Sequence, residues 1–224
     1  MIKAIVFDFD GLTVDTEYAL YESFCDILEM NPGNLPINEY AVHIGTDSSS
    51  LYNFILSQSN GLLTRDEIIE KSAVLHKAKL NKPIARDGIE DYLKAAKAQG
   101  LKIGLASSSY REWVEHFLIK LNILHYFDVI QTRDNVKKVK PDPELYENVV
   151  ELLGVNPREA IAFEDSANGS KAALAAGLNC VIVPNKITEH LPFENYHLKL
   201  ASMADKSLEE VIDSIEKSVN LLEK

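Results

Sequence analysis

Ala4-Ile-Val-Phe-Asp-Phe-Asp-Gly11 decides the fold, because it joins a short apolar run directly to two carboxylates. A run that is continuously apolar is typical of a strand buried on both faces in a parallel sheet. Asp8 and Asp10 point to the same side of an extended chain, and burying both raises at least one pKa or requires a cation. The alternative is a simple strand-to-turn junction in which Gly11 supplies a positive φ.

The same pattern, a short apolar run followed by small or polar residues, recurs along the chain. The further runs are Lys102–Ala106, Val129–Gln131, Ala160–Phe163 and Cys180–Val183. Helical patterns that close near a glycine precede several of them: Ile89–Ala98, Leu145–Leu153 and Ala167–Ala176. This alternation predicts an α/β fold with a doubly wound parallel sheet and its active groups at the carboxyl ends of the strands.

Residues 15–84 break this pattern, because they contain helix-like segments and no buried strand run. The segments are Glu17–Met30, Ser49–Ser57 and Thr64–Asn81. Thr64 and Glu67 have the spacing of a capping box at the start of the last segment. We therefore expect residues 1–14 and 85–224 to form the α/β core domain, and residues 15–84 to form a small all-helical cap domain inserted after the first strand.

The chain of 224 residues carries 23 Lys and Arg against 34 Asp and Glu, a net charge of −11. This balance repels nucleic-acid backbones and anionic membranes, so we expect neither as a partner. No stretch approaches the roughly 20 apolar residues of a membrane span, and the first apolar run is too short for a signal peptide. Cys25 and Cys180 match no metal-ligand spacing and fit a reducing compartment. We expect a cytoplasmic monomer.

Two further places in the chain, a strand end and a turn before a helix, carry residues that can bind an anion. Ser107 and Ser108 follow the second apolar run, where hydroxyls and free backbone N–H groups at the start of a helix make an anion site. The alternative is a plain serine N-cap. Lys140 precedes a turn that Pro141 and Pro143 make rigid, so this lysine is held in place and can neutralise a phosphoryl oxygen.

Glu164 and Asp165 form a second acidic pair after another apolar run. The alternative is an Asp or Ser N-cap of the helix that follows. Each of these places is ambiguous alone. Together they put an acid pair, a hydroxyl, a lysine and a second acid pair at the same edge of one sheet, and Mg²⁺ is the cation that prefers such hard oxygen ligands.

The four ordered motifs resemble those of the haloacid dehalogenase superfamily of phosphohydrolases, and the resemblance covers the whole chain. Within that superfamily the sequence is similar to the β-phosphoglucomutase-like branch. The motifs are Asp8-Phe-Asp-Gly-Leu-Thr-Val-Asp-Thr16, Ser107, Lys140-Pro141 and Glu164-Asp165. The resemblance implies a Rossmann-like core with a helical cap inserted after the first strand.

The resemblance also implies a role for each motif. Asp8 would attack phosphorus and form an aspartyl phosphate, and Asp10 would protonate the leaving oxygen and then activate water. The phosphoryl oxygens would be bound by Ser107, the backbone N–H of Ser108 and Lys140. The cofactor would be Mg²⁺, with ligands from Asp8, the backbone carbonyl of Asp10, Asp165 and, through water, Glu164.

The cap separates a phosphatase from a mutase. β-Phosphoglucomutases are recognised by a His four residues after the Thr of the first motif and by an Arg shortly after a cap Gly. Here Leu20 follows Thr16 at that spacing, and no arginine follows Gly45. We expect Mg²⁺-dependent hydrolysis of a small, sugar-phosphate-like monoester, with a β-phosphoglucomutase-type mutase as the alternative. The residues expected to face this phosphorylated metabolite are Thr16, Glu17, Thr46 and Asp47.

Two other classes of protein would use a similar set of residues. A non-catalytic protein of this fold would be expected to lack at least one of Asp8, Asp10, Lys140 and Asp165, and all four are present. A phosphoacceptor receiver domain also places acids and a lysine around Mg²⁺, but it is much shorter and has no helical insert. Residues 15–83 therefore argue against a receiver.

Overall fold

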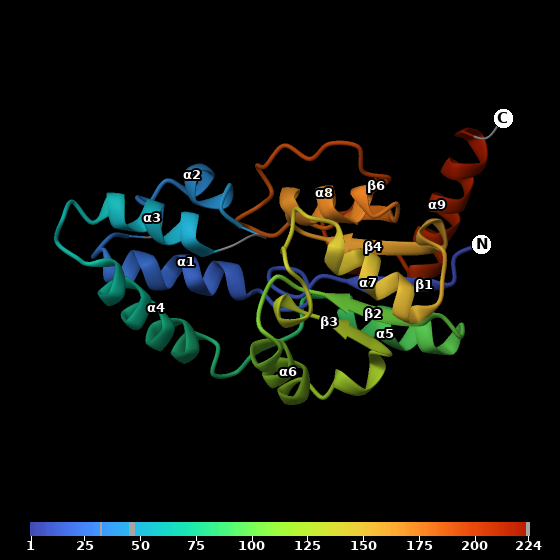
Figure 1. The fold of residues 1–224 in the computed structure, drawn as a ribbon, viewed down its shortest axis with the longest axis horizontal. Coiled ribbons are helices and arrows are strands. Elements are labelled where there is room, and N and C mark those ends of the chain that lie inside the picture. Colours follow the sequence, from blue (N-terminus) through green and yellow to red (C-terminus); the bar gives the residue numbers. More distant parts are fainter. Residues whose placement is uncertain (32, 45–47, 223–224) are drawn as a thin grey trace.

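The computed structural model describes residues 1–31, 33–44 and 48–222. In this part of the chain, strands joined by parallel pairing form a sheet of order β3-β2-β1-β4-β5-β6, which confirms the predicted doubly wound fold (Figure 1). The strands are β1 (Ala4–Phe7), β2 (Lys102–Ala106), β3 (Val129–Gln131), β4 (Ala160–Glu164), β5 (Asn179–Ile182) and β6 (Leu198–Lys199). The last strand was not predicted, because two residues carry no apolar run.

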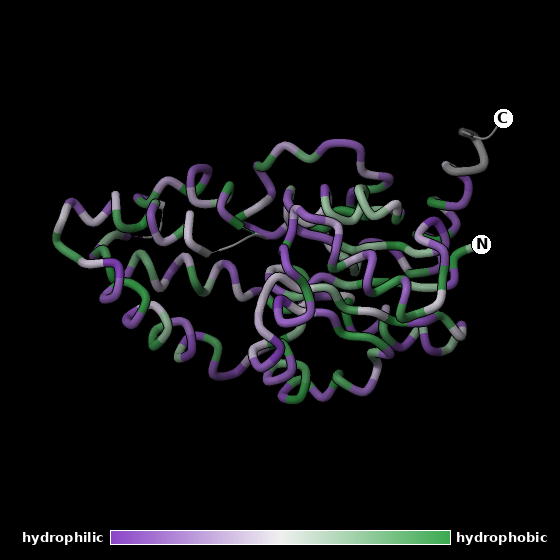
Figure 2. The backbone as a smooth tube through the Cα atoms, in the orientation of Figure 1, coloured by the Kyte–Doolittle hydropathy of each residue, from purple (hydrophilic) through white to green (hydrophobic). Residues whose placement is uncertain are grey.

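Alternate residues of the central strand serve two different apolar clusters. Ile5 and Phe7 pack with the helices α5 (Ile89–Ala98), α6 (Arg111–Lys120) and α9 (Leu208–Leu222). Ala4 and Val6 pack with α7 (Glu144–Leu153) and α8 (Ala167–Ala175) on the other face. Burial on both faces explains why the strands are continuously apolar, and Figure 2 shows apolar colouring along the strands of this part of the molecule.

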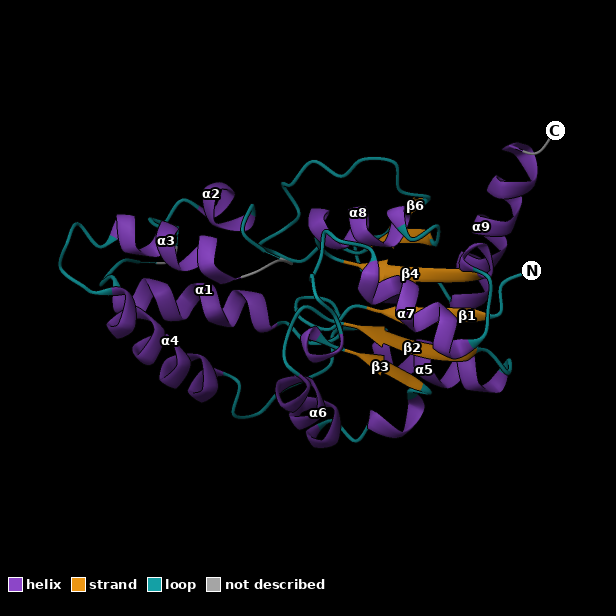
Figure 3. Ribbon diagram, viewed as in Figure 1, coloured by secondary structure: helices purple, strands orange, loops and turns teal. Residues whose placement is uncertain are grey.

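Of the helices between β1 and β2 in the described residues, those that precede α5 form a separate group at one end of the molecule (Figure 3). They are α1 (Thr16–Ile27), α2 (Ile37–Ala41), α3 (Ser48–Gln58) and α4 (Arg65–Lys79). This group has its own apolar cluster, which includes Phe24, Tyr40 and Ile55. The predicted capping box of α4 is present, whereas the short helix α2 was not predicted. We propose that the domain boundaries lie at residues 14/15 and 84/85.

The two connections between this cap and the core run side by side. Val14 forms an antiparallel bridge with Ala85, and the N–H of Arg86 donates to the carbonyl of Thr13 at 3.1 Å. Both connections therefore lie just beyond the carboxyl end of β1. The remaining short helices are η1 (Leu124–Tyr126), η2 (Arg133–Asn135), η3 (Pro157–Glu159) and η4 (Met203–Asp205). None of the helices in the described ranges is long and apolar enough to cross a membrane.

Candidate active site

The topology of the sheet brings the predicted site residues together. Asp8 follows β1 directly, Glu164 ends the neighbouring strand β4, and Asp165 comes next. Ser107 follows β2 on the other side of β1. In a doubly wound sheet the crevice at the carboxyl ends, where the strand order reverses, is the usual place for a ligand.

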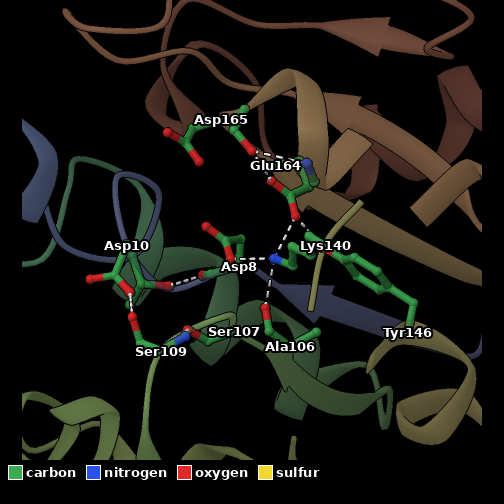
Figure 4. Close-up of polar contacts among 12 residues, drawn as sticks. Asp8, Asp10, Ala106, Ser107, Ser109, Lys140, Tyr146, Glu164 and Asp165 are labelled. Atoms are coloured by element: carbon green, nitrogen blue, oxygen red, sulfur yellow. Dashed lines mark hydrogen bonds and ion pairs between the residues drawn. The ribbon is translucent and has the colours of Figure 1, made fainter. Parts of the chain in front are cut away.

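Lys140 is the only cation buried among these acids in the described part of the chain, with 1% of its surface exposed. Its Nζ contacts Asp8 Oδ1 and donates to Glu164 Oε1 at 2.6 Å and to the carbonyl of Ala106 at 2.8 Å (Figure 4). The Tyr146 hydroxyl donates to the same Glu164 oxygen at 2.5 Å. Burial lowers the pKa of Lys140, but the two carboxylates outweigh burial and raise it, so the lysine stays charged.

The acids around Lys140 are difficult to ionise together. Burial raises the pKa of Asp8 from its ordinary 3.8 to about 7, although Lys140 acts in the opposite direction. Burial, with Asp8 and Glu164 close by, raises the pKa of Asp165 well above its usual range. Burial and the nearby Asp10 do the same to the pKa of Glu17. One lysine does not balance this much buried negative charge.

The residues present fit a divalent cation with hard oxygen ligands. Asp8, Glu164 and Asp165 each offer an oxygen, and these oxygens lie within 4.8 Å of one another. Asp165 Oδ2 accepts a hydrogen bond from Asn185 Nδ2 at 2.7 Å, but the buried Oδ1 has no partner among the described residues. A buried carboxylate oxygen without a donor is costly unless a cation meets it.

Asp10 has a different environment from Asp8, although the two are only two residues apart. Asp10 Oδ1 accepts hydrogen bonds from the Thr16 hydroxyl at 2.8 Å and from Trp113 Nε1 at 2.9 Å. Asp10 Oδ2 accepts from the Ser109 hydroxyl at 2.6 Å (Figure 4). Asp8 therefore faces the lysine and the other acids, whereas Asp10 faces hydroxyl and indole donors.

Two glycines make room for these acids. A Cβ on Gly11, whose φ is +83°, would lie 2.3 Å from Asp165 Oδ2. A Cβ on Gly169 would lie 2.0 Å from Glu164 Oε2. Ser166 is the N-cap of α8, since its hydroxyl accepts from the N–H of Gly169 at 3.0 Å. Of the two N-caps that the sequence allowed, Ser166 is the one present. The Asp165 carboxylate is therefore available to the site.

Ser107 and Ser108 lie where the second motif was expected, beside Asp8 and Asp10 in the same cavity. The Ser107 hydroxyl accepts from the N–H of Ser109 at 3.0 Å. Helix α6 has Tyr110 as its N-cap, with no side-chain cap bond. The alternative of a plain serine N-cap is therefore wrong at this strand end.

A cavity of about 500 Å³ opens between core and cap above these residues. The core side includes the two acids of the first motif, Lys140 and Trp113, and the cap side includes Thr16, Glu17, Leu20 and His76. Leu20 thus lies in the cavity wall. Two other predicted substrate-facing residues, Thr46 and Asp47, lie outside the described residues.

Several residues of the site were not predicted. Ser109 and Asn185 both follow strands, so the strand-end pattern that indicated their neighbours was also available for them. Trp113 and Tyr146 lie on helices, and Gly169 lies inside one. Nothing in the local sequence distinguishes such helical positions from ordinary packing residues.

Buried acids and a buried lysine at the edge of a parallel sheet, beside a cavity shared with a helical cap, are the arrangement expected of an α/β phosphohydrolase. The family model for haloacid dehalogenase-like hydrolases matches residues 5–183, and the chain belongs to this family. The Bacillus subtilis protein "Putative phosphatase YhcW" is 44% identical over 216 residues, which cover 96% of this chain and 98% of the relative. The protein is accordingly a phosphatase of this superfamily.

Two further comparisons place the chain within the family. The phosphorylated carbohydrates phosphatase of Thermotoga maritima is 29% identical over 79% of this chain and 82% of its own length. The crystal structure of β-phosphoglucomutase from Clostridium difficile has a TM-score of 0.76 at 24% identity, covering 98% of this chain and 99% of that one. The chain therefore shares its fold with that β-phosphoglucomutase.

Proposed function

We propose that this phosphatase hydrolyses a small, sugar-phosphate-like monoester through an aspartyl phosphate on Asp8, with Mg²⁺ as cofactor. The observation that carries the proposal is the contrast between two carboxylates on one strand end. Asp8 contacts Lys140 within a group of buried acids, whereas Asp10 is held by Thr16, Ser109 and Trp113. Two carboxylates in different environments suit different roles.

Asp8 is the nucleophile in the first half-reaction. Its carboxylate oxygen forms a bond to phosphorus while the bond from phosphorus to the ester oxygen breaks, and Asp10 gives its proton to that leaving oxygen. In the second half-reaction Asp10 takes a proton from water as the water oxygen bonds to phosphorus. The acyl phosphate bond then breaks and returns Asp8 as a carboxylate, with inorganic phosphate as the product.

The negative charge of the phosphoryl group has to be neutralised in both steps. Lys140, the Ser107 hydroxyl and the backbone N–H of Ser108 would bind its oxygens. Mg²⁺ would be held by Asp8, the backbone carbonyl of Asp10, Asp165 and, through water, Glu164, and it supplies positive charge beside the reacting oxygens. General acid–base help is worth about 10²–10⁴-fold, which is far less than the total acceleration of phosphate-ester hydrolysis. Positioning and charge neutralisation must therefore supply most of the acceleration.

Hydrolysis is favoured over sugar-phosphate mutase activity by the cavity wall. Leu20 lines the cavity at the spacing from Thr16 where the mutases carry their His. Thr16 and Glu17 also line it and would face the substrate. The relatives named as phosphatases, one of them for phosphorylated carbohydrates, support the same choice. The proposed roles of Thr46 and Asp47, the cytoplasmic location and the monomeric state remain predictions.

The test is a hydrolysis screen with Mg²⁺ over sugar phosphates, nucleotides, phosphoglycolate and pyridoxal phosphate, measured as released phosphate. We expect sugar phosphates to be the best substrates and EDTA to abolish release. Incubation with β-glucose 1-phosphate and a catalytic amount of glucose 1,6-bisphosphate distinguishes hydrolysis from the alternative mutase activity. Fast appearance of glucose 6-phosphate without released phosphate would contradict the proposed hydrolase activity and identify the protein as a mutase.

A further inference from the structure

Trp113 is the only tryptophan of the chain, and its indole lies in the cavity. It lies in the first turn of α6, and its ring packs against Phe117 of the same helix with centroids 4.7 Å apart and planes at 69°. The indole Nε1 donates to Asp10 Oδ1 at 2.9 Å. The ring is thus fixed by its own helix and directed at the carboxylate that we propose as general acid.

The three groups that donate hydrogen bonds to Asp10 differ in whether they can also accept one. The Thr16 and Ser109 hydroxyls can each donate or accept a hydrogen bond, whereas an indole N–H can only donate. Asp10 Oδ1 therefore remains an acceptor for Trp113 in both protonation states of the carboxyl group. A proton on this carboxyl group therefore fits Oδ2, because the Ser109 hydroxyl at 2.6 Å can rotate and accept a hydrogen bond from it.

A cap residue contacts this arrangement from the other side of the cavity. The ring of His76, on α4, lies 5.1 Å from the Trp113 ring at an interplanar angle of 34°. His76 Nε2 lies 2.9 Å from the carbonyl oxygen of Thr16, and because a carbonyl only accepts, Nε2 is the donor. His76 therefore touches two of the three residues that hold Asp10.

We propose that Trp113 is a positioning residue for Asp10, and that His76 supports it from the cap. Trp113 fixes which oxygen of Asp10 carries the proton and where that oxygen points, and the His76 contact makes this arrangement depend on the position of the cap. The inference rests on the proposed role of Asp10 as general acid. A general acid is effective only within hydrogen-bond reach of the leaving oxygen, so a donor that orients the acid changes the rate through the acid.

The test compares a poor and a good leaving group, measured as kcat/KM, which reports the step that breaks the ester bond. Departure of an alcohol from glycerol phosphate needs a proton, whereas departure of p-nitrophenolate from p-nitrophenyl phosphate does not. Trp113→Phe keeps an aromatic ring and removes the N–H. We expect kcat/KM to fall at least about tenfold for glycerol phosphate and to change less than about twofold for p-nitrophenyl phosphate.

Two controls make the result specific. Val114→Ala removes buried methyl groups from the neighbouring position of α6 and should lower both rates by the same factor. Asp10→Asn should show the leaving-group selectivity more strongly than Trp113→Phe. If Asp10→Asn shows no selectivity, the proposed role of Asp10 fails and the inference fails with it. If Asp10→Asn is selective and Trp113→Phe affects both substrates equally, only the inference is overturned.

The cap contact has its own readout, because Trp113 is the sole source of tryptophan fluorescence. His76→Ala should shift the emission spectrum and produce the same leaving-group selectivity to a smaller extent. Lys77→Ala, an exposed change at the next position of α4, should leave both unchanged. If His76→Ala leaves both the emission spectrum and the leaving-group selectivity unaltered, the proposed support of Trp113 by His76 is overturned.

Discussion

At the scale of single residues, the site depends on a lysine in a place that lysines rarely occupy. Lys140 is buried, and its ammonium group is shared between Asp8 and Glu164. The removal of one member of a buried charge cluster leaves the others uncompensated, which costs more than the removal of a surface charge. Lys140 is therefore expected to matter for stability as well as for activity.

Lys140→Met keeps most of the side-chain volume and removes the charge. We expect kcat/KM to fall at least about a hundredfold, since a cation is lost from the phosphoryl site, and the free energy of unfolding to fall by about 3–5 kcal/mol. Urea unfolding and phosphate release measure the two effects. Lys137→Met, an exposed change three residues earlier, should stay within about 0.5 kcal/mol of wild type; similar losses in both variants would contradict the assignment.

At the scale of elements, the short junction from β4 to α8 has to place a site residue and also start a helix. β4 ends in Glu164, which must reach Lys140, and α8 begins directly after its cap Ser166. The helix backbone passes so close to the Glu164 carboxylate that Gly169 has no room for a side chain.

Gly169→Ala tests this close approach, because we expect it to lower the free energy of unfolding, whereas the same change usually raises it in a helix. Alanine normally stabilises a helix interior by about 1 kcal/mol relative to glycine. Here the new Cβ would lie 2.0–2.1 Å from three atoms of the Glu164 carboxylate, which is held by Lys140 and Tyr146. We expect a loss of about 1–3 kcal/mol in the free energy of unfolding together with reduced activity. Ser170→Ala, on the same helix, is the control, and a thermal midpoint raised by Gly169→Ala would refute the prediction.

Most elements of the core could be predicted from the sequence, because each central strand is buried on both faces. The central strands β1 and β2 have the bounds that their apolar runs predict, as does the partly buried edge strand β3, and α5 runs from Ile89 to Ala98 as predicted. The strand ends likewise indicated the acids, and the turn at Pro141 and Pro143 indicated Lys140. The position of Trp113 against Asp10 and of His76 against Trp113 could not be predicted, since it depends on how a core helix and a cap helix pack across the cavity.

At the scale of the whole molecule, the cap and the core enclose a site that is rich in acids within a chain of net charge −11. Contacts such as Asn168 Nδ2 donating to the carbonyl of Ile44 at 2.9 Å join the two parts beside the cavity. The folded state therefore concentrates carboxyl groups that the unfolded chain keeps apart. Its stability should depend on protons and on the proposed cation together.

The pKa of Asp8 gives the sign of this dependence. Its folded value of about 7 lies above its ordinary 3.8, so the folded protein without metal binds more protons than the unfolded chain in this interval. The stability that Asp8 contributes is fully present below the unfolded pKa and is lost as the pH rises towards 7. The proposed Mg²⁺ would compete with these protons for the carboxylates and would stabilise the folded state by mass action.

We therefore expect Mg²⁺ to raise the thermal midpoint more at about pH 7.5 than at about pH 5. Thermal unfolding with and without Mg²⁺ at the two pH values measures the difference. Asp165→Asn, which removes a proposed ligand, should greatly reduce the Mg²⁺ effect at the higher pH. An equal Mg²⁺ effect at both pH values, or an undiminished one in Asp165→Asn, would contradict the proposed metal site.

The most direct test of the central claim is the rate of phosphate release by Asp8→Asn on the best substrate of the screen. The substitution preserves the size of the side chain and removes the carboxylate that we propose as the nucleophile. The account predicts a loss of at least about a thousandfold, with the far-ultraviolet circular dichroism spectrum of wild type retained. Release by Asp8→Asn at the wild-type rate would contradict the assignment of Asp8 as the nucleophile.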